Sequence, residues 1–148
     1  DFLGGYFSNF LVTTNYSRVE SAVDYEIVTG NSANTQIVQA TRPMQGQSEY
    51  TINASLQFTE PLLGTSVNIS YNKFGHRIES VGFQGSDVYE EPRDLVDLSI
   101  SQSIIQGVDG KFTIKNLAGK DLVLTRDEVP FEVSSTGTTY SLQFAFSF

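Results

Sequence analysis

The chain has a single histidine, His76, which lies between the basic residues Lys73 and Arg77. A catalytic triad needs a histidine beside a nucleophile and a carboxylate, and a structural zinc site needs several nitrogen or sulfur ligands. The sequence has no cysteine, and it offers neither a local nucleophile–base pair nor a phosphate-binding loop. We therefore expect His76 to lie in a loop or on a rim, and we expect no enzymatic activity, no cofactor and no metal centre.

Carboxylates form a second candidate site, in the cluster Asp87, Glu90, Glu91 and Asp94. Oxygen ligands of this kind hold divalent cations in proteins. Their spacing matches no known cation-binding loop, so the expected role is an acidic rim in contact with solvent. The pair Asp127 and Glu128 is interpreted in the same way.

Polar residues at the entrance to a strand form a third candidate site, made of Arg42, Gln45 and Gln47. Such residues either touch a ligand or hold a turn, and both roles stay open at this point. Together with three residues of a later connection they make up the predicted outer-loop contacts: Arg42, Gln45, Gln47, Tyr89, Glu90 and Glu91.

The end of the chain alternates strictly between large apolar and small or polar residues. The large members are Tyr140, Leu142, Phe144, Phe146 and Phe148. A period of two places them all on one face of a strand. This resembles the terminal strand of outer-membrane β-barrels, where these positions are the signal that the barrel-assembly machinery recognises. The alternative is an edge strand of a soluble β-sandwich.

The same alternation recurs along the chain and predicts an all-β, antiparallel fold without a helix. The predicted strands are residues 10–21, 49–59, 65–81, 94–104, 111–117 and 138–148. Gly75 is expected to mark a bulge in the third of them. The intervening stretches are interpreted as connections without strands.

These connections alternate in length along the chain. Residues 22–48, 82–92 and 118–137 are long, whereas residues 60–64 and 106–110 are short. Outer-membrane barrels have short periplasmic turns on one rim and long extracellular loops on the other. We therefore expect the long connections to lie outside the cell and the turns at Pro61 and Gly107 to lie inside.

The two faces of the strands predict which side chains meet lipid. We expect Phe58, Phe144 and Phe146 to face lipid, and Gln57, Gln143 and Ser147 to face the lumen. A charge near the middle of the lipid face costs about 2–4 kcal/mol for Arg or Lys. Asp97 and Lys115, the main charges near strand centres, are therefore expected on the lumen face.

Length and composition limit the alternatives. The chain has 148 residues, a net charge of -8 and 39% hydrophobic residues. The acidic balance argues against nucleic-acid binding, and no segment reaches the roughly 20 apolar residues of a spanning helix. Single-chain barrels have at least eight strands, so six cannot close. We expect this chain, which opens on Asp1, to be the carboxy-terminal part of a larger barrel, or to pair with another copy or fragment.

A family resemblance follows from landmarks in a fixed order: residues 42–56 (RPMQGQSEYTINASL), 71–78 (YNKFGHRI), 89–94 (YEEPRD), 97–101 (DLSIS) and 115–117 (KNL). They resemble the end of the barrel in TonB-dependent outer-membrane receptors, especially the Bacteroidota type. The resemblance runs from about Phe10 to Phe148.

The resemblance implies nutrient uptake through a 22-stranded barrel in the outer membrane of a Gram-negative bacterium, with this chain as roughly its last six strands. It implies as partners the membrane lipid, the rest of the barrel and its plug, TonB, the barrel-assembly machinery and a surface lipoprotein. The plug and the TonB-contacting segment are expected to be absent from this chain. Two alternatives stay open: a plugless outer-membrane barrel acting as a scaffold or partner-binding subunit, and a secreted β-sandwich binding module.

Overall fold

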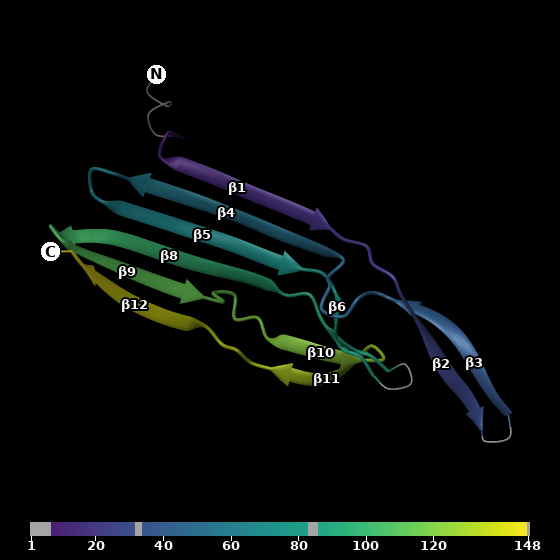
Figure 1. Ribbon diagram of the computed structural model, residues 1–148. Helices are drawn as coiled ribbons and strands as arrows, with labels where there is room; N and C mark the ends of the chain where they lie inside the picture. Colours follow the sequence, from purple (N-terminus) through teal and green to yellow (C-terminus); the bar gives the residue numbers. More distant parts are fainter. Residues whose placement is uncertain (1–6, 32–33, 83–85, 148) are drawn as a thin grey trace.

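The computed structural model describes residues 7–31, 34–82 and 86–147. Its twelve described elements are all β-strands, which form three antiparallel sheets (Figure 1). The predicted all-β antiparallel class is confirmed. In the part of the chain that the structure covers, no helix is long and apolar enough to cross a membrane.

The largest sheet contains the six predicted strands, in the order in which the chain visits them. These are β1 (Phe10–Arg18), β4 (Tyr50–Glu60), β5 (Thr65–Phe74), β8 (Asp94–Ile105), β9 (Val108–Lys115) and β12 (Thr139–Phe146). Neighbours in this order pair antiparallel, so the sheet is a meander. Among the described strands, β1 and β12 each pair with one neighbour, and the sheet is open rather than closed into a barrel.

Six further strands lie outside the large sheet. They are β2 (Val23–Asn31), β3 (Asn34–Arg42), β6 (Arg77–Ser80), β7 (Val88–Glu90), β10 (Leu122–Arg126) and β11 (Val129–Ser134). Five of them occupy the stretches predicted to be connections, and that part of the prediction is wrong, whereas β6 lies within the predicted third strand. β2 and β3 pair with each other alone, and the other four form a sheet in the order β11-β10-β7-β6. In β2 and β3, Asn, Gln and Thr residues dilute the alternation on which a sequence-based assignment depends, and the other four strands have only three to six residues each.

The predicted third strand ends earlier than expected, at Gly75. The Gly75 N–H donates to the Tyr50 carbonyl at 2.8 Å, and β6 then leaves for the four-stranded sheet. A Cβ at residue 75 would lie 2.8 Å from the Tyr50 ring, which is too close for a side chain. Gly75 therefore marks the departure of the chain from the large sheet, not a bulge within it.

The short and long connections lie at opposite ends of the large sheet, as the sequence predicts. In Figure 1 the turns β4–β5 and β8–β9 are at one end, and β2–β3 and the four-stranded sheet extend from the other. Successive strands of a meander run in opposite directions, so alternate connections emerge at the same end. The β2–β3 hairpin reaches farthest from the sheet.

Cross-strand registers give the large sheet one apolar and one polar face. One row across all six strands is Phe10, Phe58, Val67, Ile100, Phe112 and Leu142, and the next is Val12, Leu56, Ile69, Leu98, Ile114 and Tyr140. The row between them, on the opposite face, is Leu11, Gln57, Asn68, Ser99, Thr113 and Ser141. Residues directly opposite in a register point to the same side, so the apolar side is continuous across the sheet.

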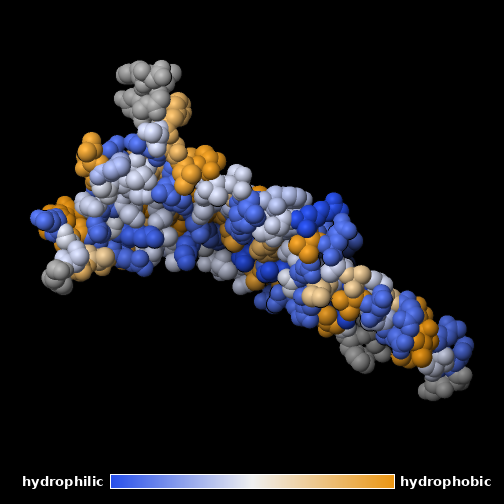
Figure 2. Space-filling model, turned by 45° about the horizontal axis from the view of Figure 1, so that its top comes forward, coloured by the Kyte–Doolittle hydropathy of each residue, from blue (hydrophilic) through white to orange (hydrophobic). Residues whose placement is uncertain are grey.

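Neither face of the large sheet is covered by the described residues. The buried hydrophobic side chains are Ile78 and Val88, both in the four-stranded sheet. Large apolar side chains of the big sheet are open instead, such as Val12 at 67% and Leu142 at 63% exposure. The space-filling view shows apolar patches on the broad body and on the projection that narrows from it (Figure 2). The apolar face therefore lacks a packing partner within this part of the chain.

Candidate functional site

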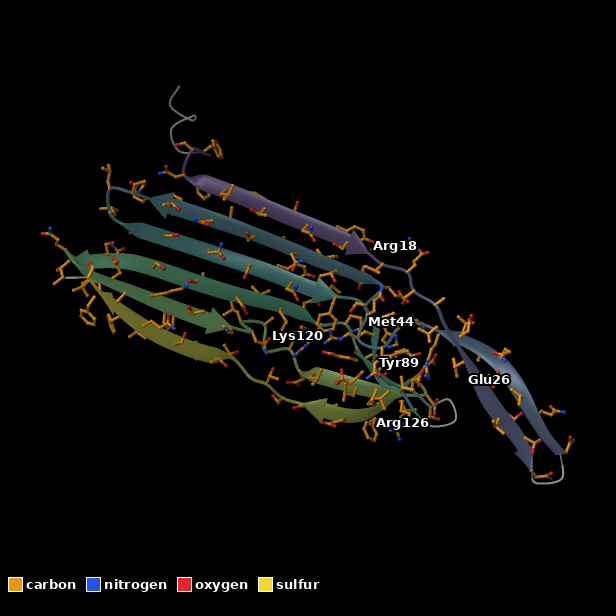
Figure 3. All side chains as sticks on the ribbon, in the orientation of Figure 1. Arg18, Glu26, Met44, Tyr89, Lys120 and Arg126 are labelled. Carbon is orange, nitrogen blue, oxygen red and sulfur yellow. The ribbon has the colours of Figure 1, made fainter. Side chains whose placement is uncertain are left out.

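The predicted outer-loop contacts meet at the end of the large sheet from which the long connections extend. Tyr89 and Glu90 lie on β7, Arg42 ends β3, and Gln45 and Gln47 lie in the segment between β3 and β4. Figure 3 places Tyr89 and Met44 at this junction. The structure divides the six predicted residues into those held by internal contacts and those that line a cavity.

Arg42 is held by contacts within the chain. Its Nη1 donates to Asp87 Oδ1 at 3.1 Å, and its guanidinium lies 4.2 Å from the centre of the Tyr25 ring. Asp87 is only 7% exposed and also accepts from the Gly82 N–H at 2.9 Å. Arg42 therefore joins the base of the β2–β3 hairpin to the chain that enters β7.

Gln45 holds a turn, one of the two roles left open by the sequence. Its Nε2 donates to the Glu79 carbonyl at 2.8 Å, and the next residue, Gly46, donates its N–H to the Ile78 carbonyl at 2.8 Å. These bonds attach the segment before β4 to β6. Gln47 lies two residues on, and it lines a cavity.

Glu90 is buried and neutralised, and it faces no open space. Both Nε and Nη2 of Arg77 donate to its Oε2, at 2.9 and 2.6 Å, and Arg93 lies 3.7 Å from Oε1. The Arg77 guanidinium also lies 4.3 Å from the centre of the Phe74 ring. A carboxylate with 3% exposure and two arginine partners connects β6 to β7 and is not available to a ligand.

Tyr89 and Glu91 form a small polar arrangement with His76. The Tyr89 and His76 rings stack with centroids 4.5 Å apart and planes 5° from parallel. His76 Nε2 lies 3.2 Å from Glu91 Oε1, which also accepts from Thr125 Oγ1 at 2.7 Å. Burial, followed by the nearby Asp87 carboxylate, raises the pKa of Tyr89 above its ordinary value. His76 lies at the rim, between β5 and β6, as predicted.

This arrangement borders an acidic cavity of about 530 Å³. Its lining includes five carboxylate residues: Glu49, Asp87, Glu91, Asp127 and Glu128. His76, Tyr89, Pro43 and Thr125 complete the wall. The cavity brings together Tyr89, Glu91 and the Asp127–Glu128 pair. The sequence alone does not predict that these residues line one cavity.

The acidic cluster of the sequence does not converge on one point. Asp94 lies at the end of the large sheet, where it accepts from Tyr71 Oη at 2.5 Å and lies 3.1 Å from Lys73 Nζ. Across residues 7–31, 34–82 and 86–147, no three His, Cys, Asp or Glu side chains are grouped to hold a metal ion. The carboxylates of this region are distributed among separate arginine, histidine and tyrosine partners.

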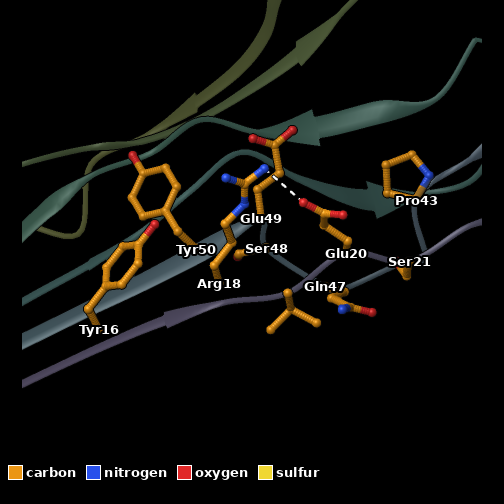
Figure 4. A pocket seen from close by; sticks show the side chains of 10 residues that line it. Tyr16, Arg18, Glu20, Ser21, Pro43, Gln47, Ser48, Glu49 and Tyr50 are labelled. Carbon is orange, nitrogen blue, oxygen red and sulfur yellow. Dashed lines mark hydrogen bonds and ion pairs between the residues drawn. The ribbon is translucent and has the colours of Figure 1, made fainter.

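A second cavity, of about 410 Å³, adjoins the first and shares Pro43 and Glu49 with it. It is lined by Tyr16, Arg18, Val19, Glu20, Ser21, Pro43, Gln47, Ser48, Glu49 and Tyr50 (Figure 4). Arg18 Nη2 donates to Glu20 Oε1 at 2.8 Å. Sequence reasoning singled out only Gln47 here. The register pairs Arg18 with Tyr50, at the end of β1 and the start of β4, and this pairing is the signal that locates the other residues.

No protein-family model matches this sequence, and neither curated proteins nor solved structures give a match. Negative charge, hydroxyl groups and stacked aromatic rings suit the reversible binding of a polar or cationic solute at the end of a β-sheet.

Proposed function

We propose that this chain forms part of the wall and outer loops of a TonB-dependent outer-membrane receptor that takes up a nutrient. One observation carries the proposal: a six-stranded meander has a continuous apolar face and a polar face, both uncovered. A transmembrane barrel needs this division, because lipid covers one face and a polar lumen meets the other. A soluble domain would have to bury the apolar face against a second layer.

Strand length supports a membrane span. β4 has 11 residues and β5 has 10, and tilted transmembrane strands need about 9–11. The apolar rows lie between polar ends on the same face, with Glu60 and Thr65 at one end and Lys73 and Asp94 at the other. An apolar band bounded by charges at both ends fits a bilayer with its two interfaces.

Asp97, within β8, and Lys115, which is the last residue of β9 and not near its centre as expected, lie on the polar side of the sheet. Asp97 pairs with Ser70, and Lys115 pairs with Thr139. Both residues alternate with the apolar row that contains Leu98 and Ile114. Charge on this side would contact lumen water or a plug and would avoid the cost of insertion into lipid.

The position of the cavities supports a receptor rather than a bare wall. Both lie at the end from which all three long connections extend, the end we assign to the cell exterior. A nutrient captured there would lie at the entrance to the lumen. The family assignment itself rests on the ordered sequence landmarks from Arg42 to Leu117.

Cysteine accessibility tests the topology, since the natural chain has no cysteine. We expect Glu132→Cys, on β11, to react with a membrane-impermeant maleimide in intact cells. Leu62→Cys, in the β4–β5 turn, should react only after the outer membrane is opened. Equal labelling of both variants in intact cells, or recovery of the protein in the soluble fraction, would refute the membrane proposal.

A photo-crosslinker at Gln57 separates the receptor from a plugless scaffold. In the parent protein Gln57 should face the lumen, so a receptor should give crosslinks within the same chain to an amino-terminal plug segment. Mass spectrometry identifies the crosslinked peptide, and the matched control is a crosslinker at Phe58, on the lipid side. If the crosslinker at Gln57 gives no crosslink to a plug segment, the result would favour the plugless scaffold.

A further inference from the structure

The β2–β3 hairpin stands apart from the rest of the molecule. Its two nine-residue strands pair with each other along their whole length and with no other described strand. The hairpin projects beyond the four-stranded sheet (Figure 1). The outer edges of both strands therefore carry unpaired backbone N–H and C=O groups.

A hairpin of this kind has too little support to be stable alone. Two-stranded hairpins are marginal in water, and a third strand is what usually stabilises them. Here apolar pairs lie on both faces, Ile27 with Val38 on one and Val28 with Ile37 on the other. Val28 and Ile37 are 59% and 63% exposed. This distribution favours a partner that lies along the hairpin edge and reaches both faces.

The β2 edge has a charge pattern with a defined complement. Val23, Tyr25 and Ile27 alternate with Asp24 and Glu26 along the strand. Between Val19 and Thr41 the sequence contains no Lys or Arg. The edge therefore presents carboxylates on one face and apolar side chains on the other. The basic residue of these two strands, Arg42 at the end of β3, pairs with Val23 and lies over the Tyr25 ring, so it is on the apolar face and leaves the carboxylate face without positive charge.

The two carboxylates are held in place by the neighbouring strand. Thr41 Oγ1 donates to Asp24 Oδ1 at 2.7 Å, and Gln39 Nε2 donates to Glu26 Oε1 at 2.7 Å. Each bond orients a carboxylate and leaves its second oxygen without a partner in the described structure. Figure 3 shows Glu26 on this projecting hairpin and Lys120 in the main body of the molecule.

We infer that the free edge of β2 binds an extended segment of a partner protein in which Lys or Arg alternates with Val or Ile. Such a segment would complete the backbone hydrogen bonds of β2 as a third strand. Its basic residues would lie opposite Asp24 and Glu26, and its aliphatic residues opposite Tyr25 and Ile27, which are favourable cross-strand pairs. A second copy of this chain fits poorly, because edge-to-edge pairing of two β2 strands opposes like charges.

The test uses the parent protein in detergent micelles and the synthetic peptide Lys-Val-Lys-Ile-Lys-Val-Lys. We expect saturable binding that slows hydrogen exchange at β2 amides and leaves β10 amides unchanged. The same peptide methylated on alternate backbone nitrogens should not bind, because it cannot form a continuous ladder. The double variant Asp24→Lys/Glu26→Lys should bind the Lys peptide at least tenfold more weakly and prefer the matching Glu peptide.

Matched variants make each outcome decisive. Asp121→Lys/Glu132→Lys changes the charge equally at two exposed residues that line neither cavity, and it should keep the wild-type affinity. Equal loss in both double variants would mean that net charge alone binds the peptide, and undiminished binding of the methylated peptide would exclude strand addition. Unchanged protection of β4 and β5 amides checks that each variant is folded. The inference does not depend on the membrane proposal, since the hairpin lies outside the large sheet.

Discussion

Asp97 and Asn116 connect the polar face of the large sheet to the chain beyond it. The Asn116 N–H donates to Asp97 Oδ1 at 2.9 Å, from the residue that directly follows β9. Asn116 has a φ of 52° and is 8% exposed. Its side-chain amide donates to the carbonyls of Lys120 and Gly137 and accepts from the Lys120 N–H. One buried amide thus holds the point where β9 ends and the last long connection begins and returns.

Replacing Asn116 should destabilise the fold more than any other single asparagine change. Asn116→Ala leaves buried backbone groups unsatisfied, at about 1–3 kcal/mol, and adds roughly 1–2 kcal/mol for a left-handed alanine. Asn116→Gly should lose only the stability that comes from the hydrogen bonds of the side chain, because glycine adopts the left-handed conformation without strain. Urea unfolding in micelles measures both, with exposed Asn15→Ala on β1 as the control. Equal midpoints for Asn116→Ala and Asn15→Ala would contradict the assigned role.

Tyr89 should give the chain a loss of stability at alkaline pH. Burial and the nearby Asp87 carboxylate raise the pKa of Tyr89, so the folded state holds the phenolic proton more tightly than the unfolded state. The stabilisation is complete below the ordinary tyrosine pKa of about 10 and disappears as pH rises through the folded value. Above pH 10, the wild-type chain should therefore lose more stability than Tyr89→Phe. The difference in phenolate absorbance between the two should titrate above pH 10, and a midpoint at or below 10 would contradict the prediction.

Gly75→Ala should destabilise the junction between β5 and β6. The added methyl group would lie 2.8 Å from the Tyr50 ring, and overpacking of this kind costs about 1–3 kcal/mol. Tyr50→Leu removes the clashing ring, so the double variant should lose less stability than the sum of the two single variants. Thermal unfolding of the wild type, the two single variants and the double variant gives the coupling free energy between residues 50 and 75. Strict additivity would mean that contact with Tyr50 is not the reason for glycine at residue 75.

Phe148 lies outside the described residues, but its role as part of the assembly signal is testable. Deleting Phe148 or replacing it with Ser in the full-length protein should lower the yield in the outer membrane. The physical cause is slower docking on the assembly machinery and the lost burial of one aromatic side chain, about 1.5–3 kcal/mol. Phe148→Tyr should be tolerated. Quantitative blotting with Asn31→Ala as control decides the matter, because equal amounts of the deletion and the control would leave the residue with a packing role only.

The large sheet was predictable because its signal is local. In β4 every second residue from Tyr50 to Phe58 is apolar, with Ala54 as the smallest member, and the register then follows from the turns. The predicted end of the first strand at residue 21 was three residues too late. β1 ends at Arg18, where its pairing with Tyr50 of β4 ends.

The smaller strands and the cavity depend on contacts between distant residues. Asp127 and Glu128 form the β10–β11 turn with φ values of 52° and 63°, a conformation that normally selects Asn or Gly. The residue types therefore predict an acidic loop, whereas the structure has a hairpin turn at these two residues. The stack of Tyr89 on His76, and the burial of Glu90 between two arginines, likewise arise only when β6 and β7 pair.

Accessibility at neighbouring positions of β4, of β12 and of the residue that follows β12 tests the membrane proposal most directly. Spin labels are placed one at a time at Phe58, Phe144 and Phe146, and at Gln57, Gln143 and Ser147, in the parent protein in its membrane. We predict that the first set is relaxed by a lipid-soluble quencher and protected from a water-soluble one, with the opposite behaviour for the second set. Equal exposure of both sets to water would contradict the assignment of the apolar face to lipid, and with it the account of this chain as part of a membrane barrel.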